Sequence, residues 1–212
     1  MKRIIFIFSF IFIWIALTGQ VLPDSALLHC KAPELFKVRF ETTKGSFTIE
    51  VIREWSPLGA DRFYQLLKTS FYNSNSLFRV QKDYVVQFGI SDKKEVNEFW
   101  ENHPIHDEFI KASNLKGTVS YARDGPETRT TQLFINLKDN FKLDTINYNN
   151  LRGFPPIGRI ISGFETAEAF YSEYGFEPAN HQDSIMVKGN EYLKRLFPNI
   201  DYIIRTTIIK EE

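Results

Sequence analysis

Standard catalytic motifs are scarce in this 212-residue sequence. It contains no glycine-rich phosphate loop and no Gly-x-Ser-x-Gly nucleophile elbow. His103 and His106 come nearest to a pair of metal ligands, but Pro104 between them breaks the helical geometry that would direct both rings to one ion. The sequence therefore predicts a surface loop with two ordinary histidines, and a chain that uses neither a metal nor a cofactor.

Another set of segments stands out because its members occur as motifs in a fixed order. These segments are Leu77–Val80, Tyr84–Gly89, Ser120–Pro126, Thr130–Asn136, Gly153–Gly158, Gly163–Glu165, Tyr174–Gly175 and Gly189–Lys194. In order and spacing, from about Lys37 to Ile209, they resemble the cyclophilin family. One of these motifs alone would be weak support, whereas the ordered set is specific.

The resemblance implies a mainly β fold, a closed eight-stranded antiparallel β-barrel capped by two α-helices. It also implies peptidyl-prolyl cis-trans isomerase activity, with Arg79 at the family's catalytic arginine position. The partners implied are unfolded or partly folded polypeptides that contain proline. Residues that the resemblance assigns to the substrate site are Tyr84, Val85, Gln87, Ala122, Arg123, Gln132, Phe134, Phe141, Leu143 and Phe154.

An arginine suits this reaction for a simple chemical reason. Rotation about a peptide C–N bond costs about 18 to 20 kcal/mol because the nitrogen lone pair is delocalised into the carbonyl. In the twisted state that lone pair becomes a free acceptor, and a fixed guanidinium can donate to it selectively there. Neither a nucleophile, a metal nor a general base is needed, which agrees with the motifs present.

One wall of the implied site departs from the family pattern. Phe154 stands where histidine is frequent, Phe141 stands in the region of the usual tryptophan, and residues 144–151 form an added stretch. Family members bind the drug cyclosporin partly through that tryptophan's indole N–H, which phenylalanine lacks. The sequence therefore predicts weak sensitivity to cyclosporin.

Taken without the resemblance, the same residues have plainer interpretations. Arg79 would be an ordinary arginine on a strand, and Tyr84, Val85 and Phe134 would be core residues. Two other functions stay open. One is a module or holdase that binds proline peptides with little turnover, and the other is a structural or carbohydrate-binding β-barrel.

The elements that must position these residues are predicted from hydrophobic periodicity. A hairpin is expected where Val38–Thr42 and Phe47–Val51 alternate in polarity around Lys44-Gly45. Ser56 as N-cap and Pro57 at the first helical position predict a helix that ends near Lys68. Further strands are expected at Leu77–Val80, Tyr84–Phe88, Gly117–Ala122, Gln132–Leu137, Gly158–Ser162 and Tyr202–Ile209, a second main helix at Phe164–Tyr174, and a short helical segment at Glu191–Phe197.

The N-terminus differs from the rest of the chain. Lys2 and Arg3 precede a 14-residue apolar run, Ile4–Leu17, which is too short for most membrane spans and typical of a signal peptide. We expect a signal peptide at 1–19, a linker at 20–36 and one domain at 37–212. The protein would then be exported, periplasmic or secreted, or membrane-anchored if the first segment stays uncleaved.

Charge and cysteine content narrow the function further. The 26 basic and 26 acidic residues cancel, so the sequence predicts no binding of nucleic acid. Cys30 is the only cysteine, and no internal disulfide can form. Its other uses would be lipid attachment or an intermolecular disulfide, but His29 is not the small residue expected before a lipidated cysteine.

Overall fold

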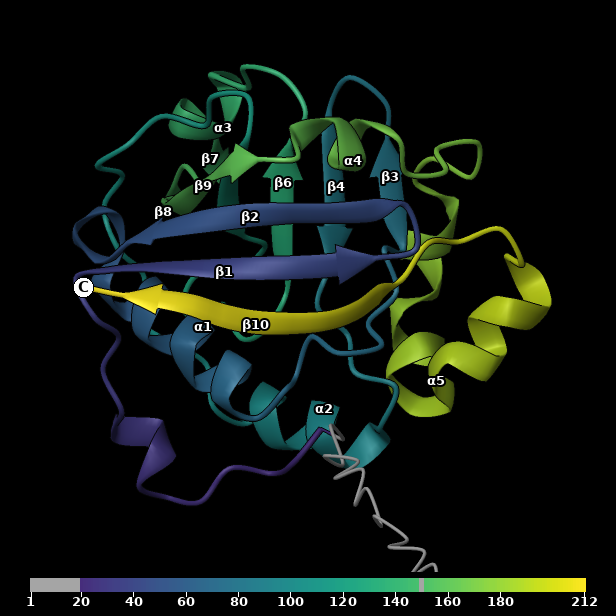
Figure 1. Cartoon of the computed structure of the whole chain (residues 1–212), viewed down its shortest axis with the longest axis horizontal. Helices are drawn as coiled ribbons and strands as arrows, with labels where there is room; N and C mark the ends of the chain where they lie inside the picture. The colour runs from purple at the N-terminus through teal and green to yellow at the C-terminus, as the bar shows by residue number, and fades with distance from the viewer. Residues whose placement is uncertain (1–19, 149–150) are drawn as a thin grey trace, which may run out of the picture.

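An eight-stranded antiparallel sheet forms the centre of the molecule, as predicted. The computed structural model describes residues 20–148 and 151–212, and the strand order is β10-β1-β2-β9-β5-β6-β4-β3. Figure 1 shows β10, β1 and β2 crossing in front of β6, β4 and β3. The strands are β1 Leu35–Thr42, β2 Gly45–Ile52, β3 Arg79–Gln81, β4 Val85–Phe88, β5 Thr118–Tyr121, β6 Leu133–Asn136, β9 Pro156–Ser162 and β10 Ile203–Glu211.

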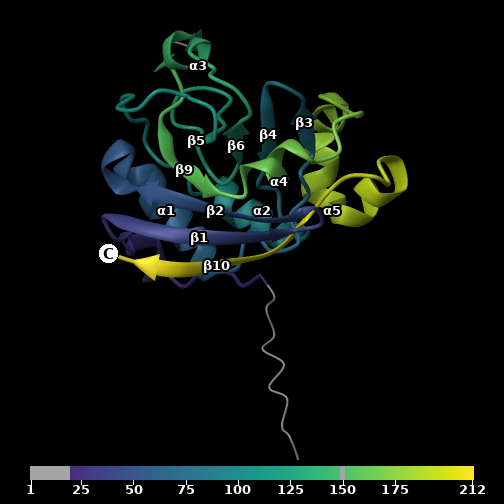
Figure 2. The same ribbon diagram turned by 45° about the horizontal axis from the view of Figure 1, so that its top comes forward.

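The sheet curls into a half-barrel (Figure 2). Its edge strands β3 and β10 share no ladder, and they approach each other at one isolated bridge between Ser76 and Tyr202. Backbone hydrogen bonds of 2.9 Å flank that bridge, from Leu77 to Asp201 and from Ile203 to Asn75. The predicted closed barrel is thus corrected to an open sheet with a single point of closure, because β3 has only three residues with which to pair.

Apolar and polar side chains alternate along β1 and β2, and the apolar ones form part of the main core. Phe36, Val38 and Phe40 of β1 are buried, and Phe40 pairs with Phe47 of β2. The rings of Phe40 and Phe47 stack with centroids 4.9 Å apart. The period of two therefore places one apolar face inward, as predicted.

Helix α1 (Pro57–Lys68) lies where it was expected, but its N-terminus is capped differently. The Ser56 side chain makes no capping bond to the helix backbone. The carboxylate of Glu108 accepts the N–H groups of Leu58 and Gly59, at 2.8 and 3.1 Å. A residue distant in sequence thus satisfies the first-turn donors, and Ser56 instead donates its hydroxyl to Glu108.

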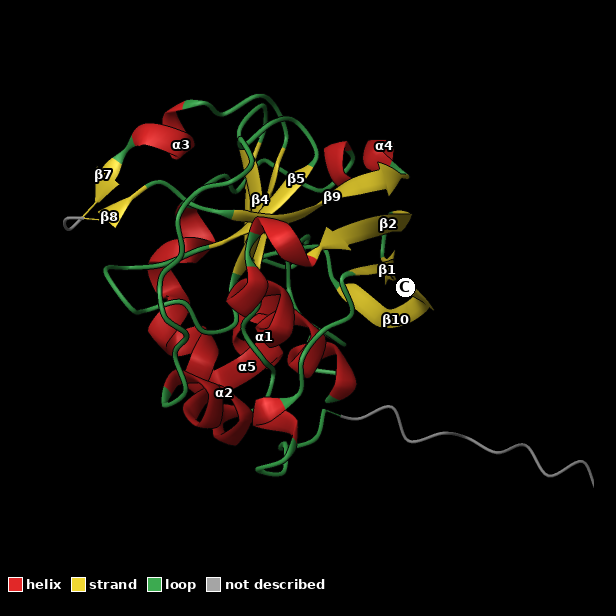
Figure 3. Cartoon of the chain, turned by 90° about the vertical axis from the view of Figure 1, so that its left-hand side faces the viewer, coloured by secondary structure: helices red, strands yellow, loops and turns green. Residues whose placement is uncertain are grey.

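The other helices differ more from the prediction. The expected helix at 164–174 is only α4 (Phe164–Glu168), because the Tyr171 N–H donates to Asp201 at 2.7 Å instead of continuing a helix. Helix α2 (Lys94–Glu101) was not predicted, although Val96 and Trp100 are buried one turn apart on it. Figure 3 shows α1, α2 and α5 gathered on the same side of the sheet.

Helix α5 (Gln182–Leu196) extends well before the predicted segment at 191–197. Gly189 interrupts it with φ 62° and ψ −156°. At this point the N–H of Asn190 donates to the Asp92 carboxylate, and a Cβ on Gly189 would lie 2.4 Å from that same carboxylate. The kink breaks the helical periodicity, which explains why only the second half was predicted.

The segment from residue 20 to residue 34 packs against the domain. Gln20 is buried, and its amide donates to the carbonyls of Phe71 and Asn73 at 2.6 and 2.8 Å. The Ala32 N–H donates to Asp61 Oδ1 at 2.8 Å. The segment is therefore part of the folded domain, and not the separate linker that its irregular pattern predicted, because its polar groups find partners on the domain.

The predicted signal peptide, residues 1–19, lies outside the described residues. Among residues 20–148 and 151–212, no helix is long and apolar enough to cross a membrane. Cys30 is a partly buried free thiol. Export thus stays a prediction from the sequence.

Candidate active site

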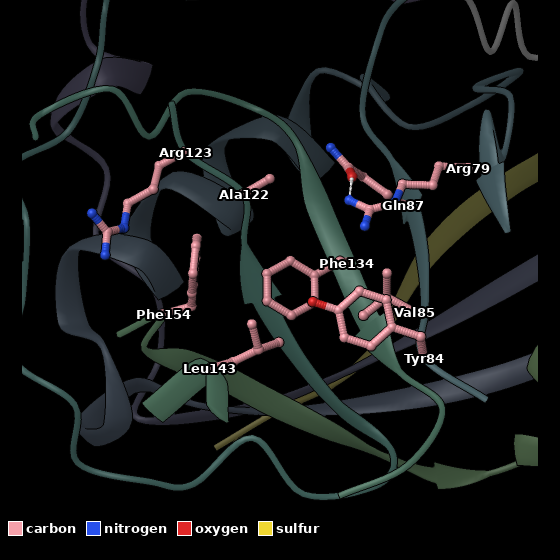
Figure 4. A pocket seen from close by; sticks show the side chains of 9 residues that line it. All are labelled: Arg79, Tyr84, Val85, Gln87, Ala122, Arg123, Phe134, Leu143 and Phe154. Atoms are coloured by element: carbon pink, nitrogen blue, oxygen red, sulfur yellow. Dashed lines mark hydrogen bonds between the residues drawn. The ribbon is translucent and has the colours of Figure 1, made fainter. Parts of the chain in front are cut away.

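Nine of the eleven predicted site residues line one pocket of about 150 Å³. Figure 4 shows Arg79 and Gln87 at one end, Arg123 at the other, and the ring of Phe134 between them. The nine residues are Arg79, Tyr84, Val85, Gln87, Ala122, Arg123, Phe134, Leu143 and Phe154. The two predicted residues outside this lining are Gln132 and Phe141.

Strand register brings the central residues of the pocket together. Arg79 of β3 pairs with Gln87 of β4, and Gln87 pairs with Phe134 of β6. Directly opposite residues of antiparallel strands project to the same face, and so does Val85, two positions before Gln87. Four side chains that are scattered along the sequence therefore share one surface of the sheet.

A chain of hydrogen bonds holds the arginine. Arg79 Nε donates to Gln81 Oε1 at 2.7 Å, and Nη1 donates to Gln87 Oε1 at 2.9 Å. The Gln87 amide in turn donates to Gln132 Oε1 at 2.9 Å. Within the described part of the chain, Nη2 of Arg79 makes no hydrogen bond or ion pair, so this nitrogen remains available as a donor.

The guanidinium is half-buried and still charged. Burial lowers the pKa of Arg79 from its usual value, and the nearby Tyr84 opposes that shift. An arginine begins so far above neutrality that it stays cationic at pH 7. The site therefore presents a partly desolvated cation, whose hydrogen bonds are stronger than those of an exposed one.

Apolar side chains form the floor beside this cation. Val85, Phe134 and Leu143 are buried in one cluster, against which Tyr84, Ala122 and Phe154 pack. The rings of Phe134 and Phe154 meet edge to face, with centroids 5.8 Å apart. A hollow with an apolar floor and an arginine at either end fits a compact apolar ring attached to a polar amide.

Arg123 uses its side chain to hold the wall of the pocket. Its Nη2 donates to the carbonyls of Leu151, at 3.2 Å, and Gly153. Its Cζ lies 4.7 Å from the centroid of the Phe154 ring. Beside it, the Ala122 N–H donates to the Gln132 carbonyl at 2.9 Å.

Gln132 and Phe141 lie next to the pocket. Gln132 lines a neighbouring hollow that shares Gln87, Ala122 and Arg123 with the pocket, and it contacts the site through its bond to Gln87. Phe141 is 58% exposed and lines a hollow on the other side. This hollow is lined by Lys142 and Leu143 of α3 (Lys142–Thr145) and by Ile146. Within the added stretch and just after it, β7 (Asn147–Tyr148) and β8 (Leu151–Arg152) pair in an antiparallel ladder.

The two histidines face different partners. His103 Nδ1 lies 2.7 Å from the Phe99 carbonyl oxygen, and His106 Nδ1 contacts the Glu127 carboxylate. In the portion of the chain that the structure describes, no group of three or more His, Cys, Asp or Glu side chains could hold a metal ion.

Two residues at the arginine were not predicted. Gln81 bonds Arg79 Nε, and its position two residues along the same strand could have indicated this contact. The ring of Phe176 lies 4.8 Å from Arg79 Cζ. No local pattern links Phe176 to Arg79, because they are far apart in sequence.

Comparison with known proteins agrees with the fold and identifies the family. Residues 37–188 match the model of the cyclophilin type peptidyl-prolyl cis-trans isomerase family. Peptidyl-prolyl cis-trans isomerase 10 of Caenorhabditis elegans is 30% identical over 135 residues, which are 62% of this chain and 79% of that protein. Human peptidyl-prolyl cis-trans isomerase-like 3 is 27% identical over 165 residues, covering 73% and 98% of the two chains. A cyclophilin type isomerase of Cryptosporidium parvum has a similar fold, with a TM-score of 0.60 at 19% identity over 84% of this chain and 99% of that chain.

The fold, the pocket and the family match together define the class of protein. The chain belongs to the cyclophilin family. It is a peptidyl-prolyl cis-trans isomerase, acting on Xaa-Pro bonds.

Proposed function

We propose that Arg79 lowers the barrier to rotation by donating a hydrogen bond to the proline nitrogen of the twisted Xaa-Pro bond. One observation carries this proposal: a half-buried guanidinium, held at Nε and Nη1, has Nη2 unpaired among the described residues beside an apolar pocket. The donor needs no reorganisation as the lone pair develops. Its bond to planar amide is weak, so the stabilisation falls on the transition state.

The apolar floor supplies the other half of the mechanism. Val85, Phe134 and Leu143 hold the pyrrolidine ring while the rest of the peptide rotates. Binding of the ring alone would not accelerate rotation, because it stabilises ground and transition states equally. The apolar floor thus binds the proline ring, and Arg79 at the edge of the pocket donates the hydrogen bond that lowers the barrier.

The substrates we propose are exported proteins that are unfolded or partly folded. The support is the N-terminal pattern of Lys2-Arg3 followed by 14 apolar residues. Uncatalysed proline isomerisation takes tens of seconds or longer, which makes it a slow step of folding for such clients. Mass spectrometry of the protein recovered from its native host tests this point: an intact N-terminus with the protein inside the cytoplasm would contradict export.

A protease-coupled assay on an Ala-Pro peptide tests the catalytic proposal against the holdase alternative. We expect the purified protein to accelerate isomerisation in proportion to its concentration. Binding of the peptide, detected by NMR, without acceleration would instead favour a holdase. Glycan binding that survives Phe134→Ala would favour a carbohydrate-binding barrel.

We expect weak inhibition by cyclosporin. None of the nine residues that line the pocket is a tryptophan, and Phe141 cannot donate an indole N–H. An inhibition curve in the same assay measures this, and submicromolar inhibition would contradict the expectation. Introducing tryptophan separately at Phe141 and at Lys142, which both line the hollow beside Leu143, should increase sensitivity where the indole reaches the drug.

A further inference from the structure

Phe176 covers Arg79 from a segment that belongs to no strand of the sheet. The centroid of its ring lies 4.8 Å from Arg79 Cζ, closer than the Tyr84 ring at 5.6 Å. Phe176 is 46% exposed, so burial in the core does not account for its position. A guanidinium within about 6 Å of an aromatic centroid is held by the ring's negative face.

One backbone bridge places this ring. Val80 pairs with Gly175 in an isolated antiparallel bridge, so the next residues outward, Arg79 and Phe176, come side by side. Gly175 has φ 55°, a left-handed conformation that favours glycine, and its N–H donates to Ser172 at 2.9 Å. The segment is therefore shaped to present residue 176 to residue 79.

Tyr174 anchors the segment to a second apolar cluster, separate from the main core, which consists of Phe78, Ile90, Ala179, Ile185, Leu193, Phe197 and Ile200. Tyr174 packs against that cluster, and its ring lies 5.2 Å from the Phe197 ring. The Glu177 N–H donates to the Tyr174 carbonyl at 3.0 Å, which closes a turn around Phe176. The ring of Phe176 is thus carried by a fixed turn.

The contact complements the two hydrogen bonds of Arg79. Gln81 and Gln87 act in the plane of the guanidinium, at Nε and Nη1. A ring near the guanidinium carbon restricts movement out of that plane and removes water from the cation. Together the three contacts leave Nη2 as the donor whose direction is set.

We propose that Phe176 is a positioning residue, which fixes and desolvates the Arg79 guanidinium so that Nη2 meets the proline nitrogen. This inference rests on the proposed role of Arg79. Phe176 would make no contact with the substrate and would affect turnover only through the position of Arg79.

Exchange NMR on an Ala-Pro peptide with the whole protein separates turnover from binding. We expect Phe176→Ala to lower the saturated exchange rate about three- to tenfold while the peptide Kd stays within twofold. Phe176→Tyr keeps an aromatic face and should restore most of the rate. Phe109→Ala, which removes a phenylalanine that is 92% exposed and lines none of the pocket, is the matched control and should change neither quantity.

Two further measurements separate positioning from a general structural effect. In an Arg79→Ala background, Phe176→Ala should cause no additional loss, because the residue it positions is gone. The Arg79 Nε–H resonance should carry a ring-current shift that Phe176→Ala removes, a readout that does not depend on activity. An unchanged rate, an additive loss in the double variant, or an unchanged resonance would each overturn the proposal. If Arg79→Ala is fully active and Phe176→Ala still removes the ring-current shift of Arg79 Nε–H, the contact between the two side chains exists but the proposed catalytic role of Arg79 is wrong.

Discussion

Arg79→Ala is expected to slow catalysed isomerisation of an Ala-Pro peptide about ten- to a hundredfold. A hydrogen bond from a charged donor is worth roughly 1.5 to 3 kcal/mol, and about 1.4 kcal/mol corresponds to a tenfold change in rate. The loss should appear in kcat/KM in the protease-coupled assay, with the peptide Kd much less affected. This pattern follows because the Nη2 bond forms chiefly in the twisted state.

Two controls make this test specific. Arg79→Lys retains a positive charge but loses the planar fork that bonds Gln81 and Gln87 at the same time, so it should recover only a small part of the rate. Gln81→Ala leaves the guanidinium in place and should cost less than Arg79→Ala. Equal rates for the wild type and Arg79→Ala would rule out the proposed donor.

The strands could be predicted because each carries its own signal. Alternation along 38–51 indicated the first hairpin, and the observed strands β1 and β2 differ from it only at their ends. The later strands were predicted as short apolar runs between polar turns, although β4, β5 and β6 are buried at every residue and show no alternation of their own. The open edge between β3 and β10 could not be predicted, since it depends on how far a three-residue strand can pair.

The helices were harder to predict from the sequence than the strands, because long-range contacts determine where they begin and where they are interrupted. The N-terminus of α1 depends on Glu108, and the kink of α5 depends on Asp92 beside Gly189. Neither partner lies near its helix in the sequence. Local periodicity therefore located α1 and the end of α5 but missed α2 and the first half of α5.

The site shows the same division between local and distant determinants. Arg79, Gln87 and Phe134 were assigned to one site by the family resemblance, and in the structure strand register brings them together. Phe176 reaches Arg79 through one bridge outside the named strands. The position of Phe141, beside the pocket and not in its lining, depends on the local turn at α3, for which the sequence holds no periodic signal.

A buried ion pair joins Glu108, in the segment before β5, to Arg129, in the loop between β5 and β6. Arg129 is fully buried, and its Nη2 lies 3.0 Å from Glu108 Oε2. The guanidinium also contacts the hydroxyl of Ser56 at 3.3 Å, the His106 carbonyl, and Asp107 Oδ1 at 3.7 Å. The Glu108 carboxylate therefore serves both as the counter-ion of Arg129 and as the cap of α1.

Glu108→Ala is expected to lower the free energy of unfolding by about 3 to 5 kcal/mol, since it leaves a buried guanidinium with only a weaker carboxylate partner and uncaps α1. At roughly 2 to 4 °C per kcal/mol for a chain of this size, Tm should fall by about 10 °C. Glu108→Gln keeps an acceptor for the helix N–H groups, so its Tm should lie between those of the wild type and Glu108→Ala. Glu98→Ala, which breaks the exposed pair with Lys94, is the matched control and should cost under about 0.5 kcal/mol. Thermal unfolding followed by circular dichroism measures all three variants. A Glu108→Ala curve that coincides with that of Glu98→Ala would show that the buried pair contributes nothing to stability, and that the other contacts of Arg129 are sufficient.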